Sequence, residues 1–361
     1  MVNGFRRAGA AVMLACAFIL SSCSQSPEEA AAPKTEFRIG WSIYAGWMPW
    51  AYAEQAGIVK KWADKYDIEI DIVQVNDYVE SVNQYTAGGL DGVTVANMDA
   101  LTIPAAGGKD TSAIIIGDYS NGNDGVLVKD TGGLSGLKGQ QVYLVELSVS
   151  HYLLARALDK AGLAMTDVST INTSDADIAG AFTSPDVSAA VAWNPQLLTM
   201  QQAPGAQLVF SSADIPGEIL DLLVVDTDTL AANPNLGKAL AGIWYETMAL
   251  MQRQDQEGAA ARAAMAALAG TTPEMFESQL ATTFLYADPK AAVAATRDAS
   301  LIETMTRVRD FSFSQGLFGQ GAQSAEMVGM AFPGGRTLGD PDNITLRFDD
   351  TYMQMAADGK L

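Results

Sequence analysis

Cysteine and histidine are almost absent from this sequence. The 361 residues include two cysteines, Cys16 and Cys23, and one histidine, His151. Downstream of Cys23 the chain can therefore form no disulfide, thiol nucleophile or thiolate metal site, and no histidine pair is available to hold zinc. The Gly-x-Ser-x-Gly turn of many hydrolases is missing as well. We expect neither an enzyme nor a protein with a cofactor or a bound metal.

Basic residues are also scarce. Lys and Arg number 22 against 42 Asp and Glu, so the formal net charge is −20, and no base occurs from Ala161 to Gly237. Nucleic acid and anionic membrane surfaces are therefore excluded as partners, because both attract positive charge. Hydrophobic residues make up 48% of the chain, which predicts a packed globular core.

The first 35 residues have the composition of a targeting segment. Arg6 and Arg7 precede an apolar stretch over 8–20, which is shorter than the roughly 20 residues that span a bilayer. The phrase Leu20-Ser-Ser-Cys23 then resembles the lipobox of bacterial lipoproteins. We predict a signal peptide over residues 1–22, a lipidated Cys23 and a tether over 23–35. The protein would lie in the periplasm or cell envelope, held to the membrane only by that lipid.

The remaining sequence alternates strand and helix patterns. Apolar, β-branched runs such as 92–96 and 141–145 alternate with helical patterns such as 78–87, which end at glycine. This alternation predicts an α/β fold with two doubly wound, Rossmann-like parallel sheets. A single helix is expected over 47–66, and another over 290–315.

The same pattern indicates two passages between domains. We predict a first domain of residues 36–125 and 226–361 and a second domain of 126–225. The two would be joined by a two-segment hinge near 126–129 and 222–226.

Ligand-binding side chains are expected where strands end. In open parallel sheets, ligands bind beyond the carboxyl ends of the strands. The polar and aromatic candidates that follow the predicted strands are Tyr44, Trp47, Asn97, Asp99, Asp118, Asn121, Asp124, Glu146, Ser148, His151, Trp193 and Asn194. Some of them have a competing structural role, since Asp99 can cap a helix and Asp118, Asn121 and Asp124 can form turns.

The missing bases indicate the charge of the ligand. None of these loops carries Lys or Arg, so a buried anion would find only backbone N–H groups as partners. A small planar cation fits better, because carboxylates accept its N–H donors and an indole face attracts it. Glu146 ends an apolar strand and is predicted to supply the decisive charge. Trp47 or Trp193 is predicted to stack on the solute.

Six phrases of the sequence also resemble a known family. They are 41–47 (WSIYAGW), 94–101 (TVANMDAL), 117–125 (GDYSNGNDG), 145–152 (VELSVSHY), 172–177 (NTSDAD) and 192–195 (AWNP). Together they look like the nitrate/sulfonate/taurine-type solute-binding proteins of ABC importers, and most like the branch associated with urea carboxylase. The resemblance implies a Venus-flytrap fold of type II in a monomer that closes on a solute and delivers it to an inner-membrane permease. For that branch it implies a nitrogen-rich solute such as guanidine.

Other ligands stay open at this point. Urea or another neutral amide would suit the same loops, and an anion of the nitrate, sulfonate or taurine type is the ligand of the wider family. Asp99, Asp118, Asp124 and Glu146 could also supply oxygen ligands to a divalent cation. The Trp and Tyr side chains expected beside these loops argue against a divalent metal ion as the ligand, because aromatic rings are poor partners for a hard cation.

Overall fold

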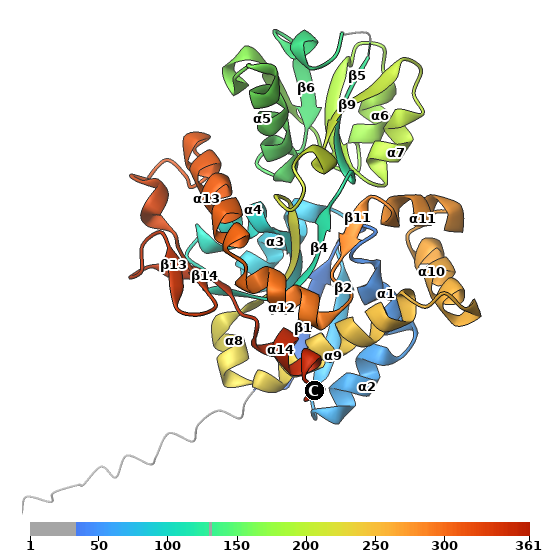
Figure 1. Ribbon diagram of the computed structural model, residues 1–361, viewed down its shortest axis with the longest axis vertical. Helices are drawn as coiled ribbons and strands as arrows, with labels where there is room; N and C mark the ends of the chain where they lie inside the picture. Colours follow the sequence, from blue (N-terminus) through green and yellow to red (C-terminus); the bar gives the residue numbers. More distant parts are fainter. Residues whose placement is uncertain (1–33, 130–131) are drawn as a thin grey trace, which may run out of the picture. The chain divides into compact units, whose positions relative to one another are not determined.

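The computed structural model describes residues 34–129 and 132–361. The predicted signal peptide, the lipidation site Cys23 and residues 24–33 of the predicted tether lie outside the described residues. Within the described part, the strands form two separate sheets, and we call the regions around them lobe I and lobe II (Figure 1).

Lobe I contains the ends of the described chain. Its strands are β1 (Glu36–Trp41), β2 (Glu69–Gln74), β3 (Gly92–Ala96), β4 (Thr111–Ser120), β10 (Leu220–Asp226), β11 (Thr283–Leu285), β12 (Gly329–Phe332), β13 (Arg336–Leu338) and β14 (Ile344–Phe348). Its helices are α1 (Met48–Gln55), α2 (Ile58–Lys65), α3 (Tyr78–Thr86), α4 (Asn97–Ala100), α8 (Thr227–Ala232), α9 (Pro234–Met251), α10 (Gln256–Leu268), α11 (Pro273–Leu280), α12 (Pro289–Arg297), α13 (Ala299–Ser314) and α14 (Thr351–Ala357). The strand order is β13-β12-β14-β4-β10-β3-β1-β2, and β11 pairs with the end of β4.

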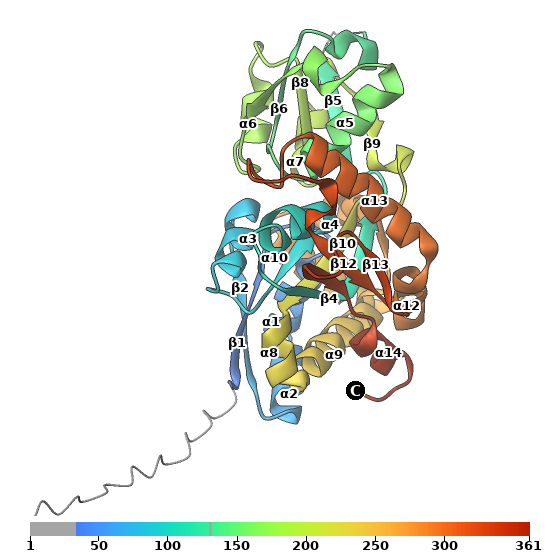
Figure 2. The same cartoon turned by 90° about the vertical axis from the view of Figure 1, so that its left-hand side faces the viewer.

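Lobe II is built from one continuous part of the chain. Its strands are β5 (Asp124–Lys129), β6 (Gln141–Leu144), β7 (Ser169–Asn172), β8 (Ala189–Trp193) and β9 (Ala206–Ser211), and its helices are α5 (Val149–Ala161), α6 (Ile178–Thr183) and α7 (Gln196–Gln201). The strand order is β7-β6-β8-β5-β9. Helix α5 packs on β5 and β8, and α13 of lobe I reaches across beside it (Figure 2).

The α/β fold with two wound sheets is as predicted, but the sheets are not wholly parallel. Strand β10 runs antiparallel to both β3 and β4, and β5 runs antiparallel to both β8 and β9. These are the strands that follow each passage between the lobes. Because the chain enters each sheet from the other lobe, it runs against the strands it joins.

The passages between lobes lie a few residues away from the predicted hinge. The chain leaves lobe I after β4 and enters lobe II at β5, so the first passage is 121–123; the second, between β9 and β10, is 212–219. The predicted segments 126–129 and 222–226 lie inside strands β5 and β10. Apolar residues of these two segments fill strand positions of the core, so the chain passes between the lobes in the loops just before the strands.

Two expected helices are each divided in two. The region 47–66 forms α1 and α2, because Gly57 adopts a left-handed φ of 74° between them. The region 290–315 forms α12 and α13, because Asp298 is extended and its side chain caps α13 by accepting from the Ser300 N–H.

The largest part of the core lies in lobe I. Helix α9 packs on α1 and α2, and the buried rings of Trp50 and Trp244 stack with centroids 5.4 Å apart. None of the helices in residues 34–129 and 132–361 combines the length and apolar character needed to cross a bilayer.

Candidate ligand site

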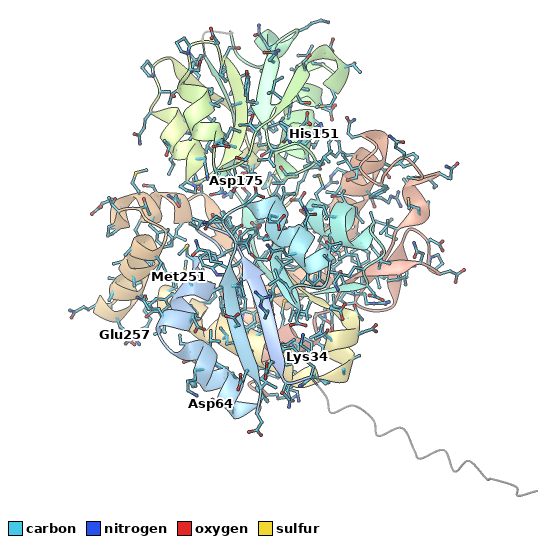
Figure 3. All side chains as sticks on the ribbon, turned by 180° about the vertical axis from the view of Figure 1, so that it is seen from behind. Lys34, Asp64, His151, Asp175, Met251 and Glu257 are labelled. Atoms are coloured by element: carbon cyan, nitrogen blue, oxygen red, sulfur yellow. The ribbon has the colours of Figure 1, made fainter. Side chains whose placement is uncertain are left out.

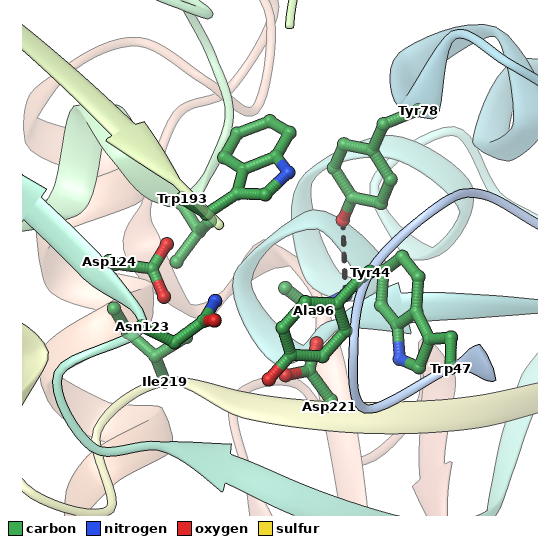
Figure 4. A pocket seen from close by; sticks show the side chains of 10 residues that line it. Tyr44, Trp47, Tyr78, Ala96, Asn123, Asp124, Trp193, Ile219 and Asp221 are labelled. Atoms are coloured by element: carbon green, nitrogen blue, oxygen red, sulfur yellow. Dashed lines mark hydrogen bonds between the residues drawn. The ribbon is translucent and has the colours of Figure 1, made fainter. Parts of the chain in front are cut away.

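A small cavity lies where the two lobes meet, and aromatic and acidic side chains line it (Figure 4). Its volume is about 30 Å³. The lining residues are Tyr44, Trp47, Tyr78, Ala96, Asn123, Asp124, Val149, Trp193, Ile219 and Asp221. No Lys, Arg or His is among these described residues, so the pocket has acidic side chains without a balancing base.

Four aromatic rings form the apolar wall of the pocket. The Tyr44 ring meets Trp47 edge-on at 5.1 Å, and Tyr78 lies 5.7 Å from both Trp47 and Trp193. The turn after β1 positions the first pair, since the N–H groups of Trp47 and Met48 both donate to Tyr44 O. Trp193 is the last residue of β8, so lobe II contributes the facing ring. The rings therefore give the pocket an apolar wall that keeps water away from it.

Asp124 brings a carboxylate from lobe II into the pocket. It begins β5, and its Oδ2 accepts a 2.5 Å hydrogen bond from Ser120 Oγ of β4. Burial raises the pKa of Asp124 to about 6, although hydrogen bonds from Ser120 and Asn123 act in the opposite direction. Ser120 Oγ also contacts Ser212 Oγ at 2.6 Å, which links the end of β4 to the second passage between the lobes.

Asp221 and Asp118 form a pair of buried carboxyl groups at the floor of the pocket. They are opposite each other on the neighbouring strands β10 and β4. Burial, followed by the charge of Asp118, raises the pKa of Asp221 well above its ordinary range. Burial raises the pKa of Asp118 to about 7, against hydrogen bonds from Asp221 and from the Tyr44 hydroxyl, whose oxygen is 2.9 Å from Oδ1. Two carboxyl groups so close together and so deeply buried disfavour two simultaneous negative charges.

Asp99 lies behind the wall formed by Tyr78. The Tyr78 hydroxyl donates to Asp99 Oδ2 and also accepts from the Ala96 N–H at 3.0 Å. Burial raises the pKa of Asp99 to about 7, while Tyr78 and the backbone N–H of Val149 lower it. Asp99 thus fixes the orientation of a pocket ring, although it is not itself a lining residue.

Three other predicted residues have mainly structural contacts. Asn97 donates to Glu218 O at 3.1 Å, Asn194 donates to Thr282 Oγ1 at 3.2 Å, and Asn121 is an exposed residue of the first passage. Asn97 and Asn194 are almost fully buried. Asn97 joins lobe I to the second passage, and Asn194 joins lobe II to the residue that precedes β11.

The predicted residues of the loop before α5 also lie outside the pocket lining. Glu146 is half-buried, and its Oε1 accepts a hydrogen bond from Thr170 Oγ1 of β7. Ser148 caps α5 by accepting from the Ser150 N–H at 3.2 Å. His151 lies on the part of lobe II that faces lobe I, its ring meets Phe311 of α13 edge-on at 6.0 Å, and burial lowers its pKa (Figure 3). The acidic residues that line this pocket are Asp124 and Asp221, and Glu146 is not among them.

Sequence reasoning found four lining residues, Tyr44, Trp47, Asp124 and Trp193, and missed three with polar groups, Tyr78, Asn123 and Asp221. Asp221 was missed because only residues following a strand were considered, and Asp221 lies near the beginning of the antiparallel β10. Tyr78 was assigned to the start of a helix, where its hydroxyl could not be placed. The sequence signal for Tyr78 is its position: it begins the helix that directly follows the strand and polar turn of residues 67–77.

The structure gives no support for a metal centre. Among the described residues, no group of three or more His, Cys, Asp or Glu side chains is placed to hold a metal ion. The pocket carboxyls face aromatic rings, which are poor partners for a hard cation.

Solved structures with the same architecture identify the class of fold. The alkanesulfonate-binding protein of Xanthomonas axonopodis pv. citri, bound to MOPS, matches with a TM-score of 0.66 and 19% identity over 80% of this chain and 96% of that one. The periplasmic nitrate-binding protein of Synechocystis PCC 6803 matches with a TM-score of 0.57 and 12% identity over 91% of this chain and 100% of that one. The fold is therefore that of the two-domain, type II periplasmic binding proteins.

The family is shown by the sequence itself. Residues 30–269 match the NMT1-like family, and the chain belongs to that family. A protein of Brucella abortus (strain 2308), whose name describes it as a binding protein, is 27% identical over 247 residues, which cover 67% of this chain and 72% of the relative.

Proposed function

We propose that this chain is the solute-binding protein of an ABC importer and that it captures a small, flat, cationic solute of the guanidinium type. The observation that carries the proposal is the pocket between the lobes, in which Asp124 and Asp221 face four aromatic rings without a base among the lining residues. Carboxylates accept the N–H donors of such a cation in pairs, and the rings attract its positive charge.

The size of the pocket favours a solute of a few heavy atoms. A volume of about 30 Å³ is a small multiple of the roughly 10–15 Å³ that one water requires. Guanidinium and urea are of this size, whereas a long-chain sulfonate would need a wider opening. Guanidinium is preferred over urea because its charge would take the place of the protons on the buried carboxyls.

The same proposal includes the cellular role. The protein would lie in the periplasm or cell envelope through the lipid on Cys23, act as a monomer and deliver its solute to a permease of the inner membrane. The family and the periplasmic-binding-protein fold support this role, in which the solute leaves unchanged.

Closure on the solute is proposed to occur about residues 121–123 and 212–219. These passages are linked to each other, since Ser212 Oγ accepts from the Gly122 N–H at 2.7 Å. Small-angle scattering should show a smaller radius of gyration when saturating solute is added. A radius of gyration that saturating solute leaves unchanged would contradict the proposed closure but not the proposed binding.

An oxyanion of the nitrate or sulfonate type is the second candidate. The structural neighbours favour it, because two of them are named for alkanesulfonate and nitrate. Helix N-termini at the pocket could supply N–H donors to an anion. The acidic lining residues argue against it.

A single thermal-shift screen separates the candidates. Guanidinium, methylguanidinium, agmatine, urea, nitrate, methanesulfonate and taurine would be compared at equal concentration and ionic strength, since a bound solute stabilises by RT ln(1 + [L]/Kd). We expect guanidinium to raise the melting temperature most and nitrate and the sulfonates to have no effect. A shift with nitrate or methanesulfonate and none with guanidinium would replace the first candidate by the second.

A further inference from the structure

Asn123 brings a buried amide into the pocket from the first passage between the lobes. Its side chain is 1% exposed and lines the pocket, and its amide end points into the space between Asp124 and Tyr44 (Figure 4). The amide oxygen Oδ1 is buried and has no hydrogen-bond partner in the part of the chain that the structure describes. A buried acceptor without a donor carries a free-energy cost, which an N–H of a bound solute would remove.

Backbone contacts fix the position from which this amide projects. The Asn123 carbonyl accepts from the Asn194 N–H of lobe II at 3.1 Å. The next residue, Asp124, donates its N–H to Ser120 Oγ of lobe I at 3.2 Å. Neither contact uses the Asn123 side chain, so a substitution of that side chain leaves both contacts in place.

The hydroxyl hydrogens of the two pocket tyrosines are used elsewhere. Tyr44 donates to Asp118 Oδ1 at 2.9 Å, and Tyr78 donates to Asp99 Oδ2 at 2.5 Å. These two aspartates are not lining residues of the pocket. The hydrogen that Asn123 Oδ1 can accept is therefore left to the solute.

We propose that Asn123 determines the specificity of the pocket: its Oδ1 accepts an N–H of the solute and thereby selects a guanidinium whose nitrogens all carry only hydrogen. This inference rests on the proposed function, because it defines the solute class at the same site. Asn123, Asp124 and Asp221 place three acceptor-bearing side chains in the lining, one for each nitrogen of guanidinium. An N-methyl group replaces one N–H donor and adds volume in a cavity of about 30 Å³. An alkylated guanidinium would leave one buried acceptor unpaired.

The test compares two solutes on two proteins. Guanidinium and methylguanidinium are titrated by calorimetry at pH 8 into the wild type and into Asn123→Leu, which has nearly the size of the amide but no acceptor. We expect the wild type to bind guanidinium at least about tenfold more tightly than methylguanidinium. In Asn123→Leu this preference should fall to about threefold or less, because guanidinium loses a partner that methylguanidinium does not use. A preference that Asn123→Leu leaves unchanged would overturn the proposal.

A second variant covers the case in which Asn123→Leu does not fold or binds neither solute. Asn123→Ala removes the same acceptor and leaves room for a methyl group. We expect it to bind methylguanidinium at least as tightly as guanidinium. Equal losses of affinity for both solutes would overturn the proposal, because a residue that only supports the fold changes the two affinities alike.

A matched control makes the same substitution two residues away, outside the pocket. Asn121 lies in the same passage, is exposed and is not a lining residue. We expect Asn121→Leu to bind both solutes within about threefold of the wild type and to keep the preference for guanidinium. A fall in that preference equal to the fall in Asn123→Leu would mean that a change in the passage, and not the pocket acceptor, sets the selectivity. The assignment of Asn123 would then fail.

The wild-type titrations keep the two proposals apart. A wild type that binds neither guanidinium nor methylguanidinium would remove the proposed solute and this inference with it. A wild type that binds guanidinium, with the same preference in Asn123→Leu, would keep the proposed solute and remove only the inference.

Discussion

Asp124 reaches the pocket from lobe II and is held there by Ser120 of lobe I. Replacing it as Asp124→Asn keeps its shape and removes its charge. Losing a charged hydrogen bond should cost about 1.5–3 kcal/mol of binding free energy, which is roughly a 10- to 150-fold weaker Kd for guanidinium. Isothermal titration calorimetry at pH 8 measures this change.

Glu146→Gln is the control for that experiment. Its carboxylate accepts from Thr170 in lobe II and does not line the pocket. We expect guanidinium affinity within about threefold of wild type, below roughly 0.7 kcal/mol. Equal losses for the two variants would show that overall charge, and not the contact with Asp124, governs binding.

Trp193 lines the pocket from lobe II and meets the Tyr78 ring edge-on, with the ring centroids 5.7 Å apart. Trp193→Leu should weaken guanidinium binding by about 0.5–2 kcal/mol, because a cation over an indole face loses that attraction. Intrinsic fluorescence of the wild type should change on titration. Trp62→Leu serves as the control, since Trp62 lies on α2 and contacts Glu246. If Trp62→Leu lowers affinity as much as Trp193→Leu, stacking in the pocket is not the cause.

At the scale of residues, the sequence predicts a pocket position only for a side chain that follows a strand running parallel to its neighbours. Trp193 lines the pocket at the end of β8, as its position after a strand suggested, whereas Asp221 was missed because β10 enters the sheet in reverse. Glu146 follows β6 as expected, but a neighbouring strand supplies Thr170 as its partner. The order of strands in the sheet decides such pairings, and no local pattern encodes that order.

Glu218 joins three elements where the chain passes back to lobe I. Its carboxylate accepts from Tyr152 and from Arg156 Nε at 2.9 Å, both on α5, and Arg307 Nε of α13 lies 3.6 Å away. Hydrogen bonds from Arg156 and Tyr152 hold the pKa of Glu218 below its usual range in spite of burial. This cluster, formed by Glu218, Arg156, Tyr152 and Arg307, connects the second passage to both lobes.

Replacing Glu218 should destabilise the fold more than replacing Arg307. Glu218→Gln removes the charge shared by all three neighbours and should lower the free energy of unfolding by about 1–2 kcal/mol, after allowance for the partly exposed Arg156. Arg307→Gln should cost less than about 1 kcal/mol, since the Arg307 side chain is 44% exposed and its Nε lies 3.6 Å from Glu218. Urea denaturation of both variants tests the order, and a larger loss for Arg307→Gln would contradict it.

At the scale of elements, apolar β-branched runs of four or five residues were predicted better than shorter strands or than the limits of long helices. Strands β3 and β6 were expected within one residue of their observed bounds. The three-residue strands β11 and β13 were missed, because three residues show no measurable alternation. The division of α1 from α2 depends on the φ of a single glycine, Gly57.

The whole molecule carries a set of buried carboxyls whose protonation sets its stability. Burial raises the pKa of Asp99 and Asp118 to about 7 and that of Asp124 and Asp175 to about 6, all from an ordinary value of 3.8. The folded state therefore binds more protons than the unfolded chain between about pH 4 and pH 7. Stability from these groups is fully present below that window and is lost as the pH rises through it.

We therefore expect the ligand-free protein to melt at a higher temperature at pH 5 than at pH 8. His151 acts in the opposite direction, because its pKa is lowered and it favours the folded state at higher pH, but it is one group against several. A cation prefers ionised carboxyls, so the stabilisation by guanidinium should be larger at pH 8 than at pH 5. Calorimetric melts at pH 5 and pH 8, with and without guanidinium, measure both effects. A ligand-free protein that melts at a higher temperature at pH 8 than at pH 5 would contradict the expected effect of the buried carboxyls.

Lobe II occupies one unbroken stretch of chain between the two passages, and this determines the order in which the lobes can be completed during synthesis. All five strands of lobe II have emerged by Ser211, whereas lobe I still lacks β10, which lies between β3 and β4, and β14, which pairs with β4. The nascent first half of lobe I therefore has unpaired strand edges until the later strands emerge, and such edges are prone to aggregation. Truncated chains that end near Ser211 should consequently contain a folded lobe II attached to an incomplete lobe I.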